Sequence, residues 1–73
     1  MAWKTEKDGL TVTYTKDNLT VVWDLGKRKY EVWRKDERTE HVDIVEQGHA
    51  PHLPVETFLQ YVEMTWGNNT KNE

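Results

Sequence analysis

The chain of 73 residues contains no cysteine and no serine, and only four glycines and two prolines. The absence of cysteine excludes disulfide bonds, cysteine-ligated zinc, iron–sulfur clusters and a thiol nucleophile, which support or equip many very small domains. With serine also absent, neither of the usual nucleophiles for acyl transfer is present. The glycines stand apart from one another, so no glycine-rich loop is available to hold a phosphate group.

Long apolar runs are also missing. The N-terminal residues 1–8 are charged and lack the apolar stretch of a secretory signal, and no segment approaches the ~20 apolar residues that span a bilayer. We therefore expect a cytoplasmic protein with no membrane partner. A chain of this length buries only about 60% of the surface that it exposes when unfolded, so we expect one small domain that gains stability as a homodimer.

Apolar and polar residues alternate with period two along most of the chain, which is typical of half-buried strands. The alternation predicts four strands, at residues 10–15, 19–25, 28–35 and 38–46, joined by short polar or glycine-containing turns. The residues expected to point toward the core are Leu10, Val12, Tyr14, Leu19, Val21, Trp23, Leu25, Tyr30, Val32, Val42 and Ile44.

The apolar spacing changes to that of a helix after Pro54. Five apolar residues recur on one stripe about 100° wide, which predicts an amphipathic helix. These residues are Val55, Phe58, Leu59, Val62 and Trp66. Pro54 suits the first helical position and Gly67 the residue just past the end.

Together these elements predict an α+β fold: a four-stranded antiparallel β-meander with one C-terminal helix packed on one face (β-β-β-β-α), in two layers. Residues 10–67 would form the single domain. Residues 1–9 would be an N-terminal arm and residues 68–73 a flexible polar tail.

One helix covers only one face of such a sheet, so the outward residues should lie on an open face. Val22, Trp33 and Val45 are outward in this pattern, and a clustered tryptophan with two valines is typical of a contact surface, although scattered exposed apolar residues are ordinary. On the helix, Tyr61 and Met64 fall beside the core stripe, either as edge packing or as a second interface. The candidate partner-binding residues are therefore Val22, Lys29, Trp33, Lys35, Val45, Tyr61 and Met64.

Charge is unevenly distributed along a chain whose net charge is −3. Residues 27–38 hold six Lys or Arg and three acids, whereas residues 39–70 hold five acids and no Lys or Arg. Aromatic rings stack on bases and cations neutralise phosphates, so the basic segment is a candidate surface for single-stranded nucleic acid. That surface would use Lys27, Arg28, Lys29, Tyr30, Trp33, Arg34 and Lys35. A charged, solvated hairpin that discourages aggregation explains the same residues.

The acidic half supports a different hypothesis. Its carboxylates could present a negative surface to a basic partner, including a protein that normally holds DNA, although such a density of acids is also ordinary in a small domain. The residues concerned are Glu40, Asp43, Glu46, Glu56 and Glu63.

His49 and His52 are the strongest candidates for metal ligands. They stand in a proline-containing loop, and their spacing matches no established zinc signature. No deep pocket is expected in a two-layer domain of this size. We therefore expect no metal site, no cofactor and no enzymatic activity.

Two segments carry a resemblance to a known family. With Tyr30-Glu31-Val32-Trp33-Arg34-Lys35 on a strand and Leu53-Pro54-Val55-Glu56-Thr57-Phe58-Leu59 entering the helix, the layout is similar to that of the PC4-like single-stranded-DNA-binding domains, which pair through their helices. This resemblance implies nucleic-acid binding through the basic aromatic third strand.

In size, lack of cysteine and acidic charge, the chain also resembles the small proteins that phages and mobile elements make to inhibit a host protein. The preferred hypothesis is a non-enzymatic binding protein that occupies a surface of another protein, for example one that handles DNA. The alternative is a PC4-like protein that binds single-stranded nucleic acid.

Overall fold

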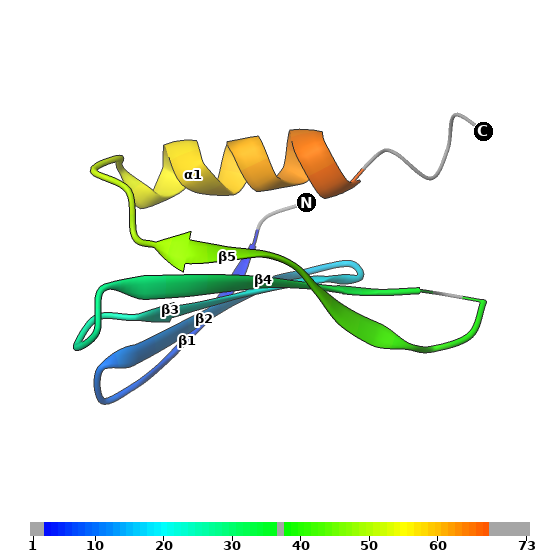
Figure 1. Ribbon diagram of the computed structural model, residues 1–73, viewed down its shortest axis with the longest axis horizontal. Helices are drawn as coiled ribbons and strands as arrows, with labels where there is room; N and C mark the ends of the chain where they lie inside the picture. Colours follow the sequence, from blue (N-terminus) through cyan, green and yellow to red (C-terminus); the bar gives the residue numbers. More distant parts are fainter. Residues whose placement is uncertain (1–2, 37, 68–73) are drawn as a thin grey trace.

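The protein is described here by a computed structural model, which covers residues 3–36 and 38–67. It is an α+β domain in which a helix lies across one face of an antiparallel five-stranded sheet (Figure 1). The strands follow one another in the order β1-β2-β3-β4-β5. Their bounds are β1 (Lys4–Asp8), β2 (Thr11–Lys16), β3 (Leu19–Asp24), β4 (Lys29–Lys35) and β5 (Val42–His49), and helix α1 (Val55–Val62) is followed by a π-helical turn, η1 (Glu63–Gly67). In this described part, no helix combines the length and apolar character needed to cross a bilayer.

The α+β class with a C-terminal helix is confirmed, but the prediction of four strands was wrong, because β1 forms a fifth strand inside the segment assigned to an arm. All five residues of β1 are exposed, so they show no apolar alternation. Backbone pairing with β2 holds the strand, with Lys4 opposite Thr15 and Asp8 opposite Thr11. Gly9 makes the connecting turn at a φ of 63°, which glycine adopts at little cost.

The core lies between the sheet and α1. Three aromatic rings from β3, β4 and α1 meet there: Phe58 packs edge-on against Trp23 and Tyr30, at ring-centroid distances of 5.0 and 4.8 Å. Such edge-to-face contacts are favourable beyond the area that they bury. The buried apolar residues are Val12, Leu19, Val21, Trp23, Val32, Phe58, Leu59 and Val62.

Two leucines predicted to be inward are exposed instead. Leu10 is 63% exposed and Leu25 is 44% exposed. Both lie just outside the strands, in neighbouring turns that are joined by a 2.8 Å hydrogen bond from the Leu25 N–H to the Leu10 carbonyl. The predicted strands 10–15 and 19–25 therefore extend one residue too far into these turns.

Strand β5 contains a bulge that reverses the predicted facing of its residues. Glu46 lies opposite Val32 and Ile44 lies opposite Trp33, so Val45 is the extra residue. As a result, Val42 and Ile44, which were predicted to point inward, are 47% and 37% exposed. Val45, which was predicted to point outward, is half-buried and packs against the core.

The ends of α1 also differ from the sequence-based expectation. Pro54 occupies the N-cap position rather than the first helical position, and its carbonyl accepts a 3.1 Å hydrogen bond from the Phe58 N–H. Gly67 lies inside η1 rather than beyond the helix. The predicted tail, residues 68–73, lies outside the described residues.

Candidate functional site

The candidate site is the face of the sheet that α1 does not cover, which we call the outer face. Because side chains alternate along each strand, the pairing registers determine which residues lie there. They form three rows across β1 to β5: Lys4, Thr15, Thr20, Trp33 and Ile44 in the first, Glu6, Thr13, Val22, Glu31 and Gln47 in the second, and Asp8, Thr11, Asp24, Lys29 and His49 in the third. Lys35 and Val42 extend the face beyond the first row.

An apolar cluster centres on Trp33 of β4. The indole is half-buried and its Nε1 donates a 3.2 Å hydrogen bond to Glu31 Oε1 on the same strand. Ile44 lies directly opposite Trp33, and Val22 lies one row away on β3. The cluster predicted from Val22, Trp33 and Val45 is therefore present with Ile44 in place of Val45.

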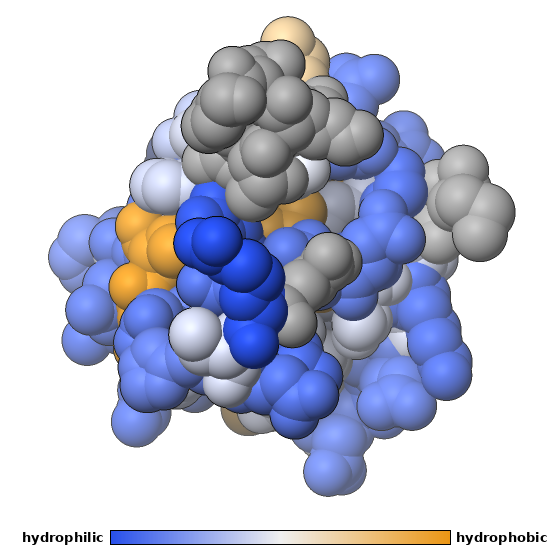
Figure 2. All heavy atoms as spheres, turned by 90° about the vertical axis from the view of Figure 1, so that its right-hand side faces the viewer, coloured by the Kyte–Doolittle hydropathy of each residue, from blue (hydrophilic) through white to orange (hydrophobic). Residues whose placement is uncertain are grey.

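In the end-on view of Figure 2, hydrophobic patches interrupt a surface that is otherwise largely hydrophilic. Lys29 and Lys35, predicted as partner-binding residues, are exposed and lie on the outer face, where Glu6 and Asp8 also lie. The outer face therefore combines an apolar cluster around Trp33 with charged side chains of both signs.

The basic aromatic segment is divided between the two faces of the sheet. Tyr30 and Arg34 lie on the covered face, where the Tyr30 hydroxyl donates to Glu46 Oε2 at 2.7 Å and Arg34 Nη1 donates to the Trp66 carbonyl at 3.4 Å. Lys27 and Arg28 lie in the exposed turn between β3 and β4. The outer face keeps only Lys29, Trp33 and Lys35 of the seven residues proposed for nucleic acid.

Glu46 has a role that the sequence analysis did not foresee. It was grouped with the acidic surface, but the bulge turns it toward α1. There Oε1 accepts hydrogen bonds from the Tyr61 hydroxyl at 2.8 Å and Trp66 Nε1 at 3.1 Å, in addition to the bond from Tyr30 to Oε2. This carboxylate therefore ties the edge strand β5 to β4, α1 and η1.

These hydrogen bonds shift the pKa values of the groups concerned. Burial and the neighbouring Glu46 carboxylate raise the pKa of Tyr30 to about 12. Burial alone would raise the pKa of Glu46, but the three donated hydrogen bonds outweigh it and the pKa is lowered. The pair is therefore a neutral phenol and a carboxylate at neutral pH.

The two helix residues proposed for a second interface differ in their surroundings. Tyr61 is 43% exposed, with its hydroxyl engaged by Glu46, whereas Met64 is 76% exposed. Tyr61 thus belongs in part to the contact between helix and sheet.

Three of the other acids lie on three different elements, η1, β5 and α1. Glu63 pairs with Lys16 of β2, and that hydrogen bond lowers the pKa of Glu63. Asp43 lies 2.9 Å from His41 Nε2, and Glu56 is exposed in the first turn of α1.

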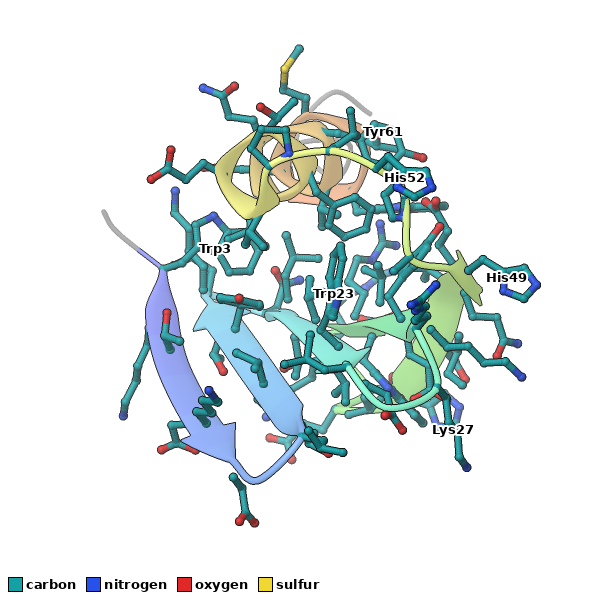
Figure 3. The ribbon with its side chains drawn as sticks, turned by 90° about the vertical axis from the view of Figure 1, so that its left-hand side faces the viewer. Trp3, Trp23, Lys27, His49, His52 and Tyr61 are labelled. Atoms are coloured by element: carbon teal, nitrogen blue, oxygen red, sulfur yellow. The ribbon has the colours of Figure 1, made fainter. Side chains whose placement is uncertain are left out.

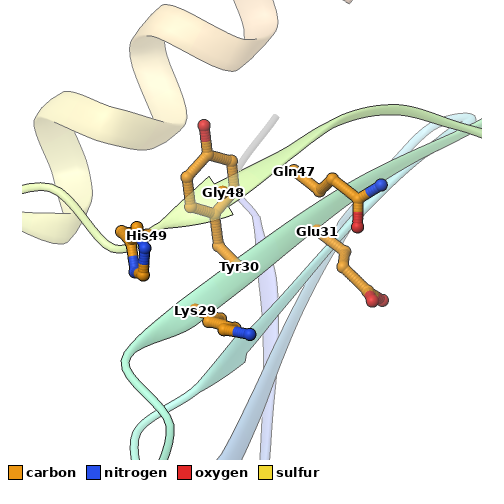
Figure 4. A pocket seen from close by; sticks show the side chains of 6 residues that line it. All are labelled: Lys29, Tyr30, Glu31, Gln47, Gly48 and His49. Carbon is orange, nitrogen blue, oxygen red and sulfur yellow. The ribbon is translucent and has the colours of Figure 1, made fainter.

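A shallow open pocket of about 220 Å³ lies between β4 and the end of β5 (Figure 4). It is lined by Lys29, Tyr30, Glu31, Gln47, Gly48 and His49. Gly48 borders the Tyr30 ring, which a Cβ at that position would approach to 3.8 Å. Four of the six lining residues, Lys29, Glu31, Gln47 and His49, belong to the outer face.

His49 and His52, the candidate metal ligands, are both exposed, at the end of β5 and in the loop that follows it (Figure 3). Within residues 3–36 and 38–67, no group of three or more potential ligand residues is placed to hold a metal ion.

Comparison with protein-family models, with curated proteins and with solved structures finds no match. The resemblance to PC4-like domains rested on four strands, and the structure has five. The functional proposal therefore depends on the geometry of the outer face.

Proposed function

We propose that the protein is a non-enzymatic binding protein that docks the outer face of its sheet on another protein. The observation that carries this proposal is the Trp33 cluster on a face that no element of the described residues covers. Aromatic residues at the centre of a polar rim contribute most of the binding energy in many protein interfaces. Because Glu31 already holds the indole, less side-chain freedom remains to be lost on binding.

The charges at the rim support a protein partner rather than a nucleic acid. Lys4, Lys29 and Lys35 share the outer face with four carboxylates, those of Glu6, Asp8, Asp24 and Glu31. Phosphates would be repelled by these acids, whereas a protein surface can present complementary charges of both signs. The displacement of Tyr30 and Arg34 to the covered face also weakens the nucleic-acid alternative.

A binding protein of this kind acts by occupying a surface that its target needs. The specific form that we favour is inhibition of a host protein in the cytoplasm, for example one that handles DNA. The inhibitor in this proposal is encoded by a phage or a mobile element. It requires no catalytic residue and no cofactor.

The test is affinity capture from the cells that produce the protein, with wild type and three variants. We expect Trp33→Ala to abolish capture of a specific protein and Lys35→Glu to weaken it. Met64→Ala, which also removes an exposed apolar side chain but on η1, should leave capture unchanged. Circular dichroism checks that each variant is folded. Equal capture by all four proteins would show that the outer face is not the binding surface.

A second measurement tests the nucleic-acid alternative. Fluorescence anisotropy of a labelled oligothymidine of ~20 nucleotides, titrated at low and near-physiological salt, should show no binding. Tight binding that weakens steeply with salt would replace the protein-partner proposal by a nucleic-acid one, with Trp33 as the stacking residue.

A further inference from the structure

Two rows of the outer face each have a side-chain pattern that complements the same row of a second copy when that row runs in the opposite direction. In the third row, Asp8 stands at the β1 end, and Lys29 and His49 stand at the β4 and β5 end. In the first row, Lys4 stands at the β1 end and Trp33 toward the other. Reversal therefore sets an acid against two basic side chains in one row and an ammonium near an indole in another.

We propose that the outer face binds a second copy of this chain about a twofold axis that runs along β3. Such an axis reverses each row and keeps the rows in order, so β1 of one copy faces β5 of the other, β2 faces β4, and β3 faces its own counterpart. Aligned packing of two sheets, with strands within about 30° of each other, is the common arrangement in β-sandwiches. This inference names an occupant for the surface assigned above and so rests on the proposed function.

The third row supplies the charge pairs of this dimer. Asp8 faces His49 of the second copy and lies beside Lys29 of the second copy, and symmetry makes each contact occur twice. Asp24 meets its own counterpart on the axis. Its Oδ1, however, accepts hydrogen bonds of 3.0 Å from the backbone N–H groups of Gly26 and Lys27, which hold the carboxylate toward the turn and partly neutralise it.

The first two rows supply the apolar centre. Val22 meets Val22 of the second copy on the axis, and the Trp33 indole faces Thr15 of the second copy. Lys4 of the second copy, next to that threonine in its row, can place its ammonium over the indole, which is a favourable cation–π arrangement.

A twofold axis that runs across the strands is less favourable. If it passed through the second row, it would pair Lys4 with Asp8 and Lys29 with Trp33, but it would also set Glu6 against Glu6 and Glu31 against Glu31. Like charges that face each other directly are destabilising. The axis along β3 avoids both of these contacts and leaves one like pair, Asp24 with its own counterpart.

The size of the face suits a reversible dimer. Five strands about 4.8 Å apart and about 20 Å long give a face of about 480 Å² in projection, which lies at the low end for specific interfaces. Since the dimer and the partner of the proposed function use the same residues, a partner must compete with the second copy. Self-association would therefore shield Trp33 until a partner displaces it.

Sedimentation velocity of the full chain over a concentration series tests the inference by charge reversal. Asp8→Lys and Lys29→Glu should each weaken self-association about tenfold, because each brings like charges together between copies. The double variant should recover to within about threefold of wild type, because the two symmetry-related contacts between positions 8 and 29 become attractive again. Within one copy the two residues lie three strands, or about 14 Å, apart, so the recovery cannot come from an intramolecular pair.

Two further variants complete the design. Glu56→Lys reverses a charge on the exposed side of α1 and should leave self-association unchanged. Val22→Arg sets two cations against each other at the centre of the outer face and should abolish self-association in a chain that circular dichroism shows to be folded. A monomer at every concentration, or a dimer that tolerates Val22→Arg, would overturn the inference. A dimer that Val22→Arg abolishes but the double variant does not restore would overturn the axis along β3.

The inference and the proposed function fail in different ways. A monomeric wild type whose capture of a partner still depends on Trp33 would overturn the dimer and leave the proposed function standing. A dimer that passes the charge-reversal test, together with capture that is indifferent to Trp33→Ala, would overturn the proposed function alone.

Discussion

Replacing Glu46 with glutamine tests the contact that ties the edge strand to the helix. The Glu46 carboxylate accepts hydrogen bonds from Tyr30 at 2.7 Å, Tyr61 at 2.8 Å and Trp66 at 3.1 Å. The amide oxygen of glutamine can still accept the bonds from Tyr61 and Trp66, but its NH₂ group then faces Tyr30. The Tyr30 hydroxyl must therefore turn and accept, and all three bonds lose the help of the negative charge.

The expected loss follows from these bonds. A hydrogen bond to a charged group contributes about 1.5–3 kcal/mol and a neutral one about 0.5–1.5 kcal/mol, so three bonds give an upper limit of about 3–4 kcal/mol. Tyr61 is 43% exposed, and bonds that share one carboxylate are not additive, so the real difference is smaller. We expect Glu46→Gln to lower the free energy of unfolding by about 1–2 kcal/mol, and the Tm by about 5–15 °C in a domain of this size.

The same contact predicts a pH dependence. Despite burial, the hydrogen bonds from Tyr30, Tyr61 and Trp66 hold the pKa of Glu46 in the folded protein below its ordinary value of 4.5. A carboxylate whose pKa is lowered by folding stabilises the protein above its unfolded pKa, and this stabilisation is lost as the pH falls through the folded pKa. The difference in stability between wild type and Glu46→Gln should therefore be full at neutral pH and should close as the pH falls from 4.5 through the lowered pKa of Glu46.

Urea unfolding followed by circular dichroism measures this difference at neutral and acidic pH. Glu6→Gln, at an exposed carboxylate on β1, is the matched control and should change stability by less than about 0.5 kcal/mol. Equal unfolding midpoints for wild type and Glu46→Gln at neutral pH would refute the assignment of Glu46 as the tie between strand and helix. A loss that persists unchanged at low pH would show that packing, rather than charge, explains the effect.

Further predictions concern the Lys16–Glu63 pair and two of the glycines. Lys16, only 13% exposed at its side chain, pairs with Glu63, so Lys16→Met should lower the free energy of unfolding by about 0.5–1.5 kcal/mol. A double-mutant cycle with Glu63→Gln measures the coupling, and strictly additive losses would contradict a direct pair. Gly9→Ala should cost about 1 kcal/mol because φ at Gly9 is 63°, whereas Gly48→Ala should be neutral or slightly stabilising because its Cβ would meet the Tyr30 ring at an ordinary 3.8 Å. Thermal unfolding compares the two alanine variants, and equal Tm values would contradict this reasoning.

The period-two and helical patterns predicted the centre of the fold well. Val21, Val32 and Val62 are the largest fully buried side chains, and each was placed inward by spacing alone. The pattern is clear in β2 to β4 and α1 because each has one covered side and one open side, so apolar and polar residues must separate. The same alternation placed Val22 and Trp33 on the outer face, where the structure has them.

Strand β1 could not be found from alternation because neither of its faces is covered. Its five exposed residues are held by backbone hydrogen bonds to β2, and these leave no mark on side-chain polarity. One local signal was available. Gly9 is the first of the two residues that join Asp8 to Thr11, and glycine at the first position of a two-residue turn is an indication of a tight hairpin.

The facing of β5 could not be predicted because one extra residue reverses it. Val42, Ile44 and Val45 are all β-branched and apolar, so the sequence supports either facing, and only the pairing with β4 shows that Val45 is the extra residue. The bulge puts Ile44 and Glu46, two positions apart, on opposite faces of the sheet, which a regular strand never does. Ile44 thereby completes the apolar cluster around Trp33, while Glu46 becomes the acceptor that anchors α1. The candidate site and the attachment of the helix thus depend on the same single residue, Val45, even though they lie on different faces.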